Sequence, residues 1–299
     1  MDRLDSMKVL LETVNAGSLS AAARRLNLPL ATVSRKVSEL EAHLGTSLFT
    51  RAGRGLQLTD TGRTYAAACK RILEEIGEAE RTASGEYSEP RGDLTLSAPI
   101  VFGRLHVLPV VLEFLKAYRE INVRLMLADR VVDLNEDHID LAVRISLLPD
   151  SSLMAARLGS IRRVVCASPA YLAARGTPQH PSELMDHCCV TRDTLAFAAR
   201  WDFQDGNKLL PVNFHARLVV NTAEAAIDAA LSSLGVTRVF SYQVAEAVRA
   251  AVLVEVLTRF EPPPLPVSLV YQRERLLPQK LRTFIDFAAP RIKARVAGA

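Results

Sequence analysis

Arginine and lysine side chains gather near the N-terminus, in a segment whose chemistry suits contact with nucleic-acid phosphates. Between Arg24 and Arg63 there are seven basic residues against three acids, a net charge of +4. The whole chain of 299 residues also carries +4, so the sequence outside this segment sums to zero. Because positive charge held in one short stretch is the electrostatic footprint of a nucleic-acid-binding element, the segment predicts contact with double-stranded DNA. The basic residues are Arg24, Arg25, Arg35, Lys36, Arg51, Arg54 and Arg63.

Residue patterns for catalysis or metal binding are weak in comparison. The sequence has no G-x-S-x-G, no H-E-x-x-H and no P-loop, and Gly53-Arg54-Gly55 lacks the third glycine of a nucleotide loop. His180 and His187 precede Cys188 and hint at a thiol nucleophile with a nearby base, but the Pro-Ser-Glu-Leu between the two histidines is more typical of a surface loop and helix cap. The four cysteines have no C-x-x-C spacing, which favours reduced thiols in a cytoplasm. We therefore expect no catalytic residue, cofactor or metal site, and an enzyme remains only as an alternative.

Two short helical patterns position the basic residues. The first has apolar side chains at i, i+3, i+4 and i+7 and is preceded by Ser18 as N-cap. After a tight break at Asn27-Leu28-Pro29, the second repeats its apolar residues at spacings of three and four. The pair predicts a helix-turn-helix; the alternative, an ordinary helical hairpin of a core, is disfavoured by the charge. The apolar positions are Leu19, Ala22, Ala23, Leu26, then Leu30, Val33, Val37, Leu40 and Leu44, which leaves Thr32, Arg35, Lys36 and Glu39 outward.

Elements on either side complete the N-terminal domain. An earlier amphipathic helix ends at Gly17 and would supply the third wall of the core. Residues 48–58 place apolar residues on both sides of a glycine-rich tip, which predicts a short hairpin or wing that carries Arg51 and Arg54. The stripe of the earlier helix consists of Leu4, Met7, Leu11 and Val14.

A long helix is expected from Thr59 to about Tyr87. Its apolar residues are spaced 4, 3, 4, 3 and 4 apart, which is the repeat of a coiled-coil seam, and its flanks are charged. A second copy of the chain is the natural cover for this seam; the alternative is that the seam packs on the chain's own downstream domain. The seam residues are Tyr65, Cys69, Ile72, Ile76, Ala79 and Ala83.

Beyond a polar linker at 84–92, short apolar strands alternate with helical patterns. This alternation predicts an α/β region with mostly parallel sheets, and a hydrophobic content of 49% suffices for sizeable cores. No apolar run approaches the roughly 20 residues of a membrane helix, and the first residues contain no apolar export segment, so we expect a cytoplasmic protein. The expected strands are 94–97, 123–127, 141–145, 164–167, 218–220, 235–239 and 267–271.

Short motifs along the chain resemble one family of bacterial proteins. GSLSAAARRL, TVSRKVSELE, LGTSLFTR and LTDTG, in this order near the N-terminus, are similar to the DNA-binding domain of LysR-type transcriptional regulators. The similarity continues through LTLSAP, DHIDLAVR, RRVVCASPAYL, GTPQHPSEL, PPPLPVSLVY and LRTFIDF, so it covers nearly the whole chain.

The resemblance implies an all-α winged helix-turn-helix domain over 1–58, a linker helix for dimerisation with a hinge over 59–91, and an effector-binding domain over 92–299. This last domain would have two α/β lobes like type 2 periplasmic binding proteins, about 92–163 with 267–299, and about 164–266. The function implied is transcriptional regulation by a homodimer or homotetramer that binds an imperfect inverted repeat and responds to a small molecule. RNA polymerase would be a partner of an activator. The alternative is a nucleoid-type DNA binder without a ligand.

The start of the second helix departs from the family, which commonly has Ser-Gln where this chain has Pro29-Leu30. Proline suits the first turn of a helix, but a glutamine that could bond the edge of adenine is lost. Asn27 in the turn is expected to be structural. In the matching positions, the resemblance implies that the arginines and the lysine read bases or bind phosphates and that the hydroxyl groups form hydrogen bonds with DNA. The implied DNA-facing residues are Ala31, Thr32, Ser34, Arg35, Lys36, Arg51 and Arg54.

A ligand of such a two-lobed domain binds at the carboxyl ends of the strands, where helix N-termini present free amides. Ser97 beside a helix start and Arg144 nearby together favour a carboxylate or another small anion. The alternative is that Arg144 pairs with Asp140 or Asp133 and that Ser97 only caps the helix, and Asp129 would repel an anion. The candidate effector-binding residues are Ser97, Ala98, Pro99, Asp129, Arg144, Asn221, Thr222 and Thr237.

Overall fold

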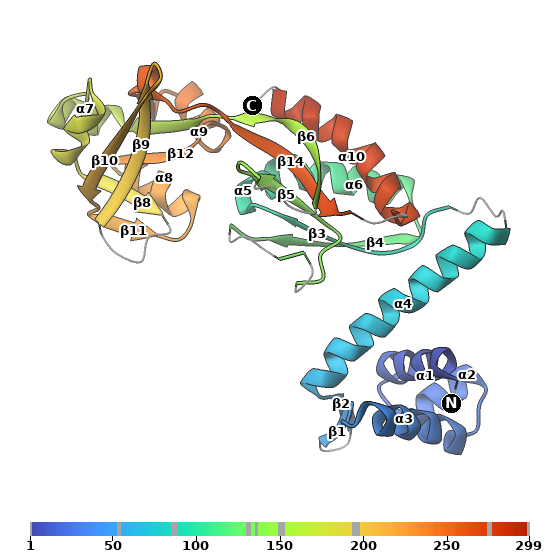
Figure 1. Cartoon of the computed structure of the whole chain (residues 1–299). Coiled ribbons are helices and arrows are strands. Elements are labelled where there is room, and N and C mark those ends of the chain that lie inside the picture. The colour runs from blue at the N-terminus through green and yellow to red at the C-terminus, as the bar shows by residue number, and fades with distance from the viewer. Residues whose placement is uncertain are drawn as a thin grey trace. The chain divides into compact units, whose positions relative to one another are not determined.

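The structure is a computed structural model that describes residues 2–52, 55–84, 89–129, 133–134, 137–148, 153–192, 198–273 and 277–297. The chain divides into two compact units, Met1–Glu89 and Pro90–Ala299, and Figure 1 labels most of their helices and strands. Within the described ranges no helix is long and apolar enough to cross a membrane.

The N-terminal unit is a helix-turn-helix with a two-stranded wing and a long last helix. Gly17, at φ +70°, ends the first helix, and Ser18 Oγ accepts the N–H of Ala21 as N-cap of the second, as predicted. Asn27 ends the second helix at φ +51°, a left-handed conformation that asparagine tolerates well, which confirms its structural role. The elements are α1 (Arg3–Ala16), α2 (Leu19–Leu26), α3 (Leu30–Leu44), β1 (Phe49–Ala52), β2 (Gly55–Leu58) and α4 (Asp60–Ser84).

The face that α1 buries differs from the predicted stripe. Ser6 and Thr13 are buried, whereas Leu4 is 41% exposed. Each buried hydroxyl donates to a carbonyl of its own helix, Ser6 to Asp2 and Thr13 to Val9. Because these hydroxyls are satisfied inside the helix, they enter the core without leaving a polar atom unpaired. Met7 and Leu11 of the predicted stripe do pack against the core, so the apolar periodicity was right there and wrong at Leu4.

Helices α2 and α3 bury most of the residues predicted for them. Ala22 and Ala23 of α2 pack with Val33 and Val37 of α3 in one cluster that also contains Val9 of α1. The confirmed pattern leaves the opposite face of α3 in solvent. Leu30 is the exception within the predicted stripe, since it lies at the first position of α3 and is 48% exposed.

The first turns of α4 belong to the core of this same unit. Cys69 is fully buried with Leu10, Leu40 and Leu48, and Tyr65 packs against that cluster. The prediction that Cys69 faces a second copy is therefore wrong, because no part of its side chain is left for a partner. Tyr65 is half-buried in the same place. Burial also raises the pKa of the Cys69 thiol, as expected for an unreactive core cysteine.

The Leu58–Gly62 motif explains how α4 starts beside the wing. Thr59 Oγ1 accepts the N–H of Gly62 and donates to the carbonyl of Ser47. A Cβ at Gly62 would lie 2.0 Å from the carbonyl oxygen of Leu48, so only glycine allows this close approach.

The second unit contains two lobes, each built on a five-stranded sheet (Figure 1). In the first lobe the strand order is β4-β3-β5-β14-β6, and one face packs on α6 and α10 through Leu96, Phe114, Leu269 and Phe284. Its elements are β3 (Gly92–Ala98), α5 (Ile100–Phe102), the π-helical turn η1 (Gly103–Val107), α6 (Leu108–Ala117), β4 (Ile121–Leu127), β5 (Leu141–Ile145), β6 (Leu153–Ile161), β14 (Leu265–Gln272) and α10 (Gln279–Ala297).

In the second lobe the strand order is β11-β8-β12-β7-β13. Ile227 of α8 and Val244 of α9 cover one face of this sheet, and Trp201 and Phe203 of a separate hairpin cover the other. The elements are β7 (Arg163–Ala167), α7 (Pro169–Arg175), η2 (Pro181–Met185), β8 (Cys189–Arg192), β9 (Ala198–Asp205), β10 (Lys208–His215), β11 (Leu218–Val220), α8 (Ala223–Leu231), β12 (Val236–Phe240), α9 (Ser241–Arg249), β13 (Val254–Val256) and η3 (Thr258–Phe260).

Both sheets are mixed, which corrects the prediction of mostly parallel sheets. In the first lobe β3 runs parallel to β4 and β5, but β14 runs antiparallel to β5 and β6. In the second lobe β8 runs parallel to β11 and β12, but β7 runs antiparallel to β12 and β13. The reason is the double crossing of the chain, which leaves the first lobe after β6 and returns into β14.

One arginine ties the two crossing segments together. Arg162, between β6 and β7, donates from Nη1 to Glu261 at 2.8 Å and from Nη2 to Glu255 at 3.2 Å. Burial raises the pKa of the Glu261 carboxyl, and the ion pair with Arg162 opposes this shift. The pairing holds the start of β7 beside the segment that leads back to β14.

Candidate DNA-binding and effector-binding sites

The exposed face of α3 carries four of the predicted DNA-facing residues. Ala31 and Arg35 are exposed, and Thr32 and Ser34 are half-buried. Pro29 precedes the helix in an extended conformation, and its carbonyl accepts the N–H groups of Thr32 and Val33. Proline therefore starts α3 without disturbing it, since the missing proline N–H would have had no partner in the helix.

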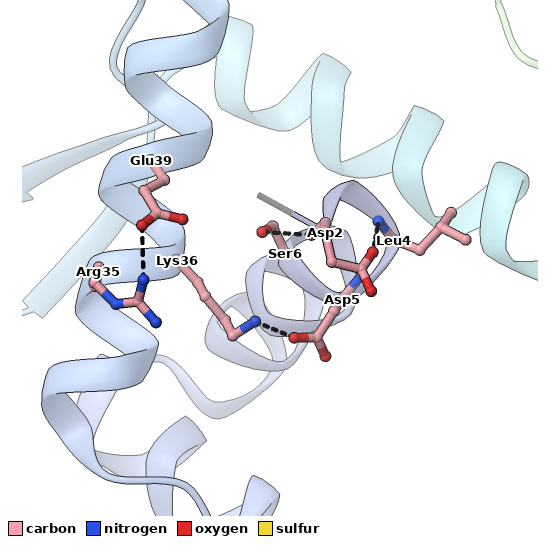
Figure 2. Close-up of polar contacts among 7 residues, drawn as sticks. All are labelled: Asp2, Leu4, Asp5, Ser6, Arg35, Lys36 and Glu39. Carbon is pink, nitrogen blue, oxygen red and sulfur yellow. Dashed lines mark hydrogen bonds and ion pairs between the residues drawn. The ribbon is translucent and has the colours of Figure 1, made fainter.

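Arg35 is the most prominent cation on this face. Its Nη1 donates to Glu39 Oε1 at 2.9 Å, one helical turn away, and 65% of the arginine side chain is exposed (Figure 2). Exposed i, i+4 pairs contribute only a few tenths of a kcal/mol, roughly 0.3–0.5. Arg35 can therefore exchange this partner for another hydrogen-bond acceptor at little cost.

Lys36 has a different role from the one predicted. Its Nζ forms an ion pair with the carboxylate of Asp5 on α1, and the lysine side chain is mostly buried (Figure 2). Asp2 also stabilises this end of α1, because its Oδ1 accepts the N–H groups of Leu4 and Asp5. Lys36 thus fastens α3 to the first turn of α1, and the assignment of Lys36 to the DNA surface is corrected.

The wing contributes Arg51 from β1, at a position that pairs with Leu56 of β2. The side chain of Arg51 and the whole of Arg54 lie outside the described residues. Their phosphate-binding roles stay predictions.

Two predicted effector-site residues come together on one face of the first sheet. Ser97 of β3 pairs in register with Ala142 of β5. Arg144 lies two residues after Ala142 on β5 and pairs with Ser268 of β14. Because residues two apart on a strand share a face, Ser97 and Arg144 lie on the face opposite the one that packs on α6 and α10. Ser97 and Ser268 are both buried polar residues there. Arg144 reaches the end of β5, close to the carboxyl end of β3.

The segment after β4 joins the two lobes directly. Asp129 Oδ1 accepts the N–H of Ile100 at the start of α5, and its Oδ2 accepts from Nη1 of Arg192 at 3.1 Å. Since the Asp129 charge is neutralised by an arginine of the other lobe, the expected repulsion of an anion is weakened. Ala98 and Pro99 form the corner between β3 and α5.

An aromatic cluster lies beside this ion pair. Phe102 and His106 of the first lobe contact Tyr242 of the second, with ring centroids 5.6 and 5.5 Å apart, respectively. Nε2 of His106 is buried without a hydrogen-bond partner among the described residues, and burial, followed by the charge of Arg295, lowers the pKa of this imidazole. Burial is also the main cause that raises the pKa of Tyr242. Neutral rings therefore hold the lobes together here.

The second-lobe candidates divide into two groups. Thr222 is the N-cap of α8, where its Oγ1 accepts the N–H of Ala225, and Asn221 before it is exposed. Thr237, in contrast, is fully buried, and its hydroxyl donates to the carbonyl of Val190. The prediction that Thr237 adds a hydroxyl to a ligand site is wrong, because Thr237 is the second residue of β12, buried inside the sheet and away from the carboxyl end of the strand.

Two segments of the chain match descriptions of one family. Residues 4–63 match the bacterial regulatory helix-turn-helix protein, lysR family, and residues 88–293 match the LysR substrate binding domain. This chain belongs to the LysR family of transcriptional regulators.

Relatives of this LysR-type regulator match along nearly their whole length. The probable HTH-type transcriptional regulator LtrA of Klebsiella pneumoniae is 32% identical over 301 residues, which cover 100% of this chain and 97% of that protein. The HTH-type transcriptional activator AaeR of Escherichia coli K12 is 29% identical, with 96% and 93% covered.

Solved structures agree with this assignment. The full-length virulence activator AphB of Vibrio cholerae has a TM-score of 0.61 at 26% identity, covering 95% of this chain and 98% of that one. CrgA of Neisseria meningitidis, a LysR-type transcriptional regulator, has a TM-score of 0.61 at 29% identity, with 96% and 98% covered. Members of this family are regulators, and the resemblance seen in the sequence motifs is confirmed.

The histidines considered for a thiol nucleophile serve the regulator's fold. His187 Nδ1 lies 3.1 Å from the hydroxyl of Tyr171, which accepts the N–H of Cys188. His180 caps η2 through the N–H of Ser182, and Glu183 completes a capping box. The prediction of a loop and helix cap in this segment is confirmed.

The part of α4 beyond Cys69 remains available to another molecule. Ile72 is 36% exposed, Ile76 is half-buried and Ala79 is exposed. The side chain of Ala83 lies outside the described residues. The candidate dimer surface of this regulator is thus shorter than predicted, because the first two positions of the seam are used by the core of the DNA-binding domain.

The regulator has three arginines at the second lobe that sequence reasoning missed. Arg192 ends β8, Arg238 lies over the Trp201 ring at 5.1 Å, and Arg163 lies over Phe240 at 5.6 Å. Burial, followed by the positive charge of Arg163, lowers the pKa of Arg238 to about 10. The sequence analysis expected no strand at β8, so the position of Arg192 at a strand end is known from the structure alone.

Proposed function

We propose that this LysR-type regulator reads an operator through the exposed face of α3 and does so as a dimer, so that its target is an imperfect inverted repeat. The observation that carries the proposal is the exposure of Arg35 on a helix whose opposite face is buried. Arg35 can also exchange its ion-pair partner, Glu39, for another acceptor at little cost. An arginine in this position suits the O6 and N7 acceptors of guanine in the major groove. A dimer with two such helices requires two half-sites related by symmetry.

Arg35→Ala is expected to weaken binding to the cognate operator by about 1–3 kcal/mol and to relax specificity at one base pair. Random DNA should lose much less, because Arg35 contributes mainly a base contact. Arg51→Ala should instead weaken all sequences equally and reduce the slope of log K against log salt by about 0.9. Fluorescence anisotropy over a salt series measures both quantities.

Glu39→Gln is the matched control for Arg35, because it removes the negative charge of the internal partner and keeps the size of the side chain. Binding of this variant should equal or exceed that of the wild type. Equal losses on cognate and random DNA for both arginine variants would refute the division into base reading and phosphate holding.

The effector is proposed to be a small anion, with a carboxylate as the leading class. Support comes from Ser97 and Arg144 on one sheet face at the carboxyl ends of the strands, and from Arg192, whose ion pair offsets the negative charge of Asp129 at the lobe junction. Thr222 marks the N-terminus of α8, which adds free amides and a positive dipole end on the side of the second lobe.

A thermal-shift screen of small acids, neutral aromatics and amines tests this class. A carboxylate at 100 times its dissociation constant should stabilise the wild type by about 2.7 kcal/mol, and Ser97→Ala and Arg144→Ala should each lose most of that response. Arg124→Ala removes an arginine from the middle of the edge strand β4, where it pairs with Thr95 and not with a residue at the carboxyl end of β3, and should respond like the wild type. A cationic or neutral stabiliser, or unchanged responses in both variants, contradicts the anion proposal and leaves DNA binding untouched.

A further inference from the structure

The start of the recognition helix α3 is an exposed apolar surface. Leu30 is its first residue and is 48% exposed, with exposed Pro29 before it and exposed Ala31 after it. A single exposed leucine is ordinary on a protein surface, so exposure alone decides nothing. The informative feature is the position of this leucine, at the N-terminus of a helix whose next turn carries Arg35.

The polar and charged residues around Leu30 complement DNA. Arg24 of α2 is exposed and lines the same shallow hollow as Leu30, together with Ser20 and Asn27. Ser34 lies one helical turn after Leu30 and is a short hydrogen-bonding residue on the same face. The N-terminus of α3 adds its positive dipole end. The polar and charged residues around Leu30 therefore suit a polyanion, and Leu30 is the apolar part of the surface that would contact the polyanion.

The major groove offers an apolar side chain one specific contact. Thymine presents a C5-methyl group there, and none of the other three bases carries a methyl group at its major-groove edge. A leucine has no hydrogen-bonding atoms, so it cannot satisfy a donor or acceptor that it desolvates, and it would disfavour base pairs that place such a group opposite it.

We propose that Leu30 is a specificity-determining residue that reads the C5-methyl group of one thymine in each half-site. The inference rests on the proposed DNA-binding function and names the base that this position selects. Burial of one methyl group is worth about a 4-fold change in affinity per half-site, and therefore about 15-fold for two symmetric half-sites.

Thymine-to-deoxyuridine replacement tests the contact with a single missing methyl group. Operator sequences would first be selected from random duplexes with the full-length protein, and each thymine in both half-sites would then be replaced in turn by deoxyuridine. Binding of the wild type should fall by about 15-fold at one symmetric pair of positions and change little elsewhere. Leu30→Ala should bind the thymine and deoxyuridine operators with equal affinity at that pair.

Leu4→Ala is the matched control, because Leu4 is a similarly exposed leucine of the same unit. It should keep the full preference for thymine, and circular dichroism should show that both variants are folded. If no thymine pair is sensitive to replacement, or if Leu30→Ala keeps the sensitivity, Leu30 does not read the methyl group and the DNA-binding proposal stands. If the wild type selects no sequence at all from random duplexes, the DNA-binding proposal fails and takes this inference with it.

Discussion

Replacing both Ile72 and Ile76 by aspartate is expected to dissociate the proposed dimer and to weaken operator binding by at least about 100-fold. The two isoleucines lie on α4 beyond the turns that Cys69 and Tyr65 commit to the DNA-binding domain. Introducing two charges into an apolar contact costs more than the roughly 2–7 kcal/mol of an unpaired neutral polar group, and about 2.7 kcal/mol already corresponds to 100-fold. Two half-sites then no longer act together, so the gain from bivalent binding is lost.

Sedimentation velocity at micromolar concentration and operator titration measure the two parts of this prediction. Ala67→Asp is the control for a single introduced carboxylate on this helix, since Ala67 is exposed on the opposite side of α4. A wild type that is monomeric yet binds its operator normally would refute a dimer built on α4. So would a double variant that sediments like the wild type.

The second large effect is expected at Asp129. Asp129→Ala removes both the acceptor of the Ile100 N–H and the partner of Arg192, in a pair whose side chains are only 16% and 22% exposed. Arg192 then remains close to the positive charge of Arg163 without compensation. Loss of one partner from a largely buried pair costs about 3 kcal/mol, which corresponds to a fall of roughly 6–12 °C in the melting temperature of a unit of about 200 residues.

Differential scanning calorimetry of the full-length protein provides the measurement. Asp129→Asn keeps an acceptor for Ile100 and should lose less than the alanine variant. Arg192→Met in the Asp129→Ala background should recover part of the stability, because it removes the unpaired cation. Strict additivity of the two substitutions, or a shift below 1 °C for Asp129→Ala, would mean that this ion pair does not hold the lobes together.

The sequence alone determined features that depend on neighbouring residues. Ser18, Asn27 and Gly17 set helix ends through local hydrogen bonds and backbone conformation, and the structure has them as predicted. The apolar repeats of α2 and α3 identified Val33, Val37 and Leu40 as buried, because a helix with one apolar stripe has one face to bury. The concentration of positive charge and the order of the motifs were sufficient to predict the family.

Tertiary structure decided the roles of residues whose partners are distant in the chain. Lys36 has the exposed pattern of a DNA-binding residue, but Asp5, 31 positions away, binds it. Cys69 fits a coiled-coil repeat, but Leu10 and Leu48 cover it first. Thr237 fits a strand beside a ligand, but the register with Val190 buries its hydroxyl in the sheet.

Two of the missed strands, β6 and β13, have the same explanation. β6 contains Arg157 and Gly159, and β13 has only three residues, so neither carries an alternating pattern of its own. Each forms because a neighbouring strand, β14 or β7, offers free backbone groups at the right register. Backbone pairing between segments about a hundred residues apart depends on the arrangement of the whole lobe, and no local sequence pattern encodes it. Helix caps and apolar stripes, in contrast, are complete within one or two helical turns.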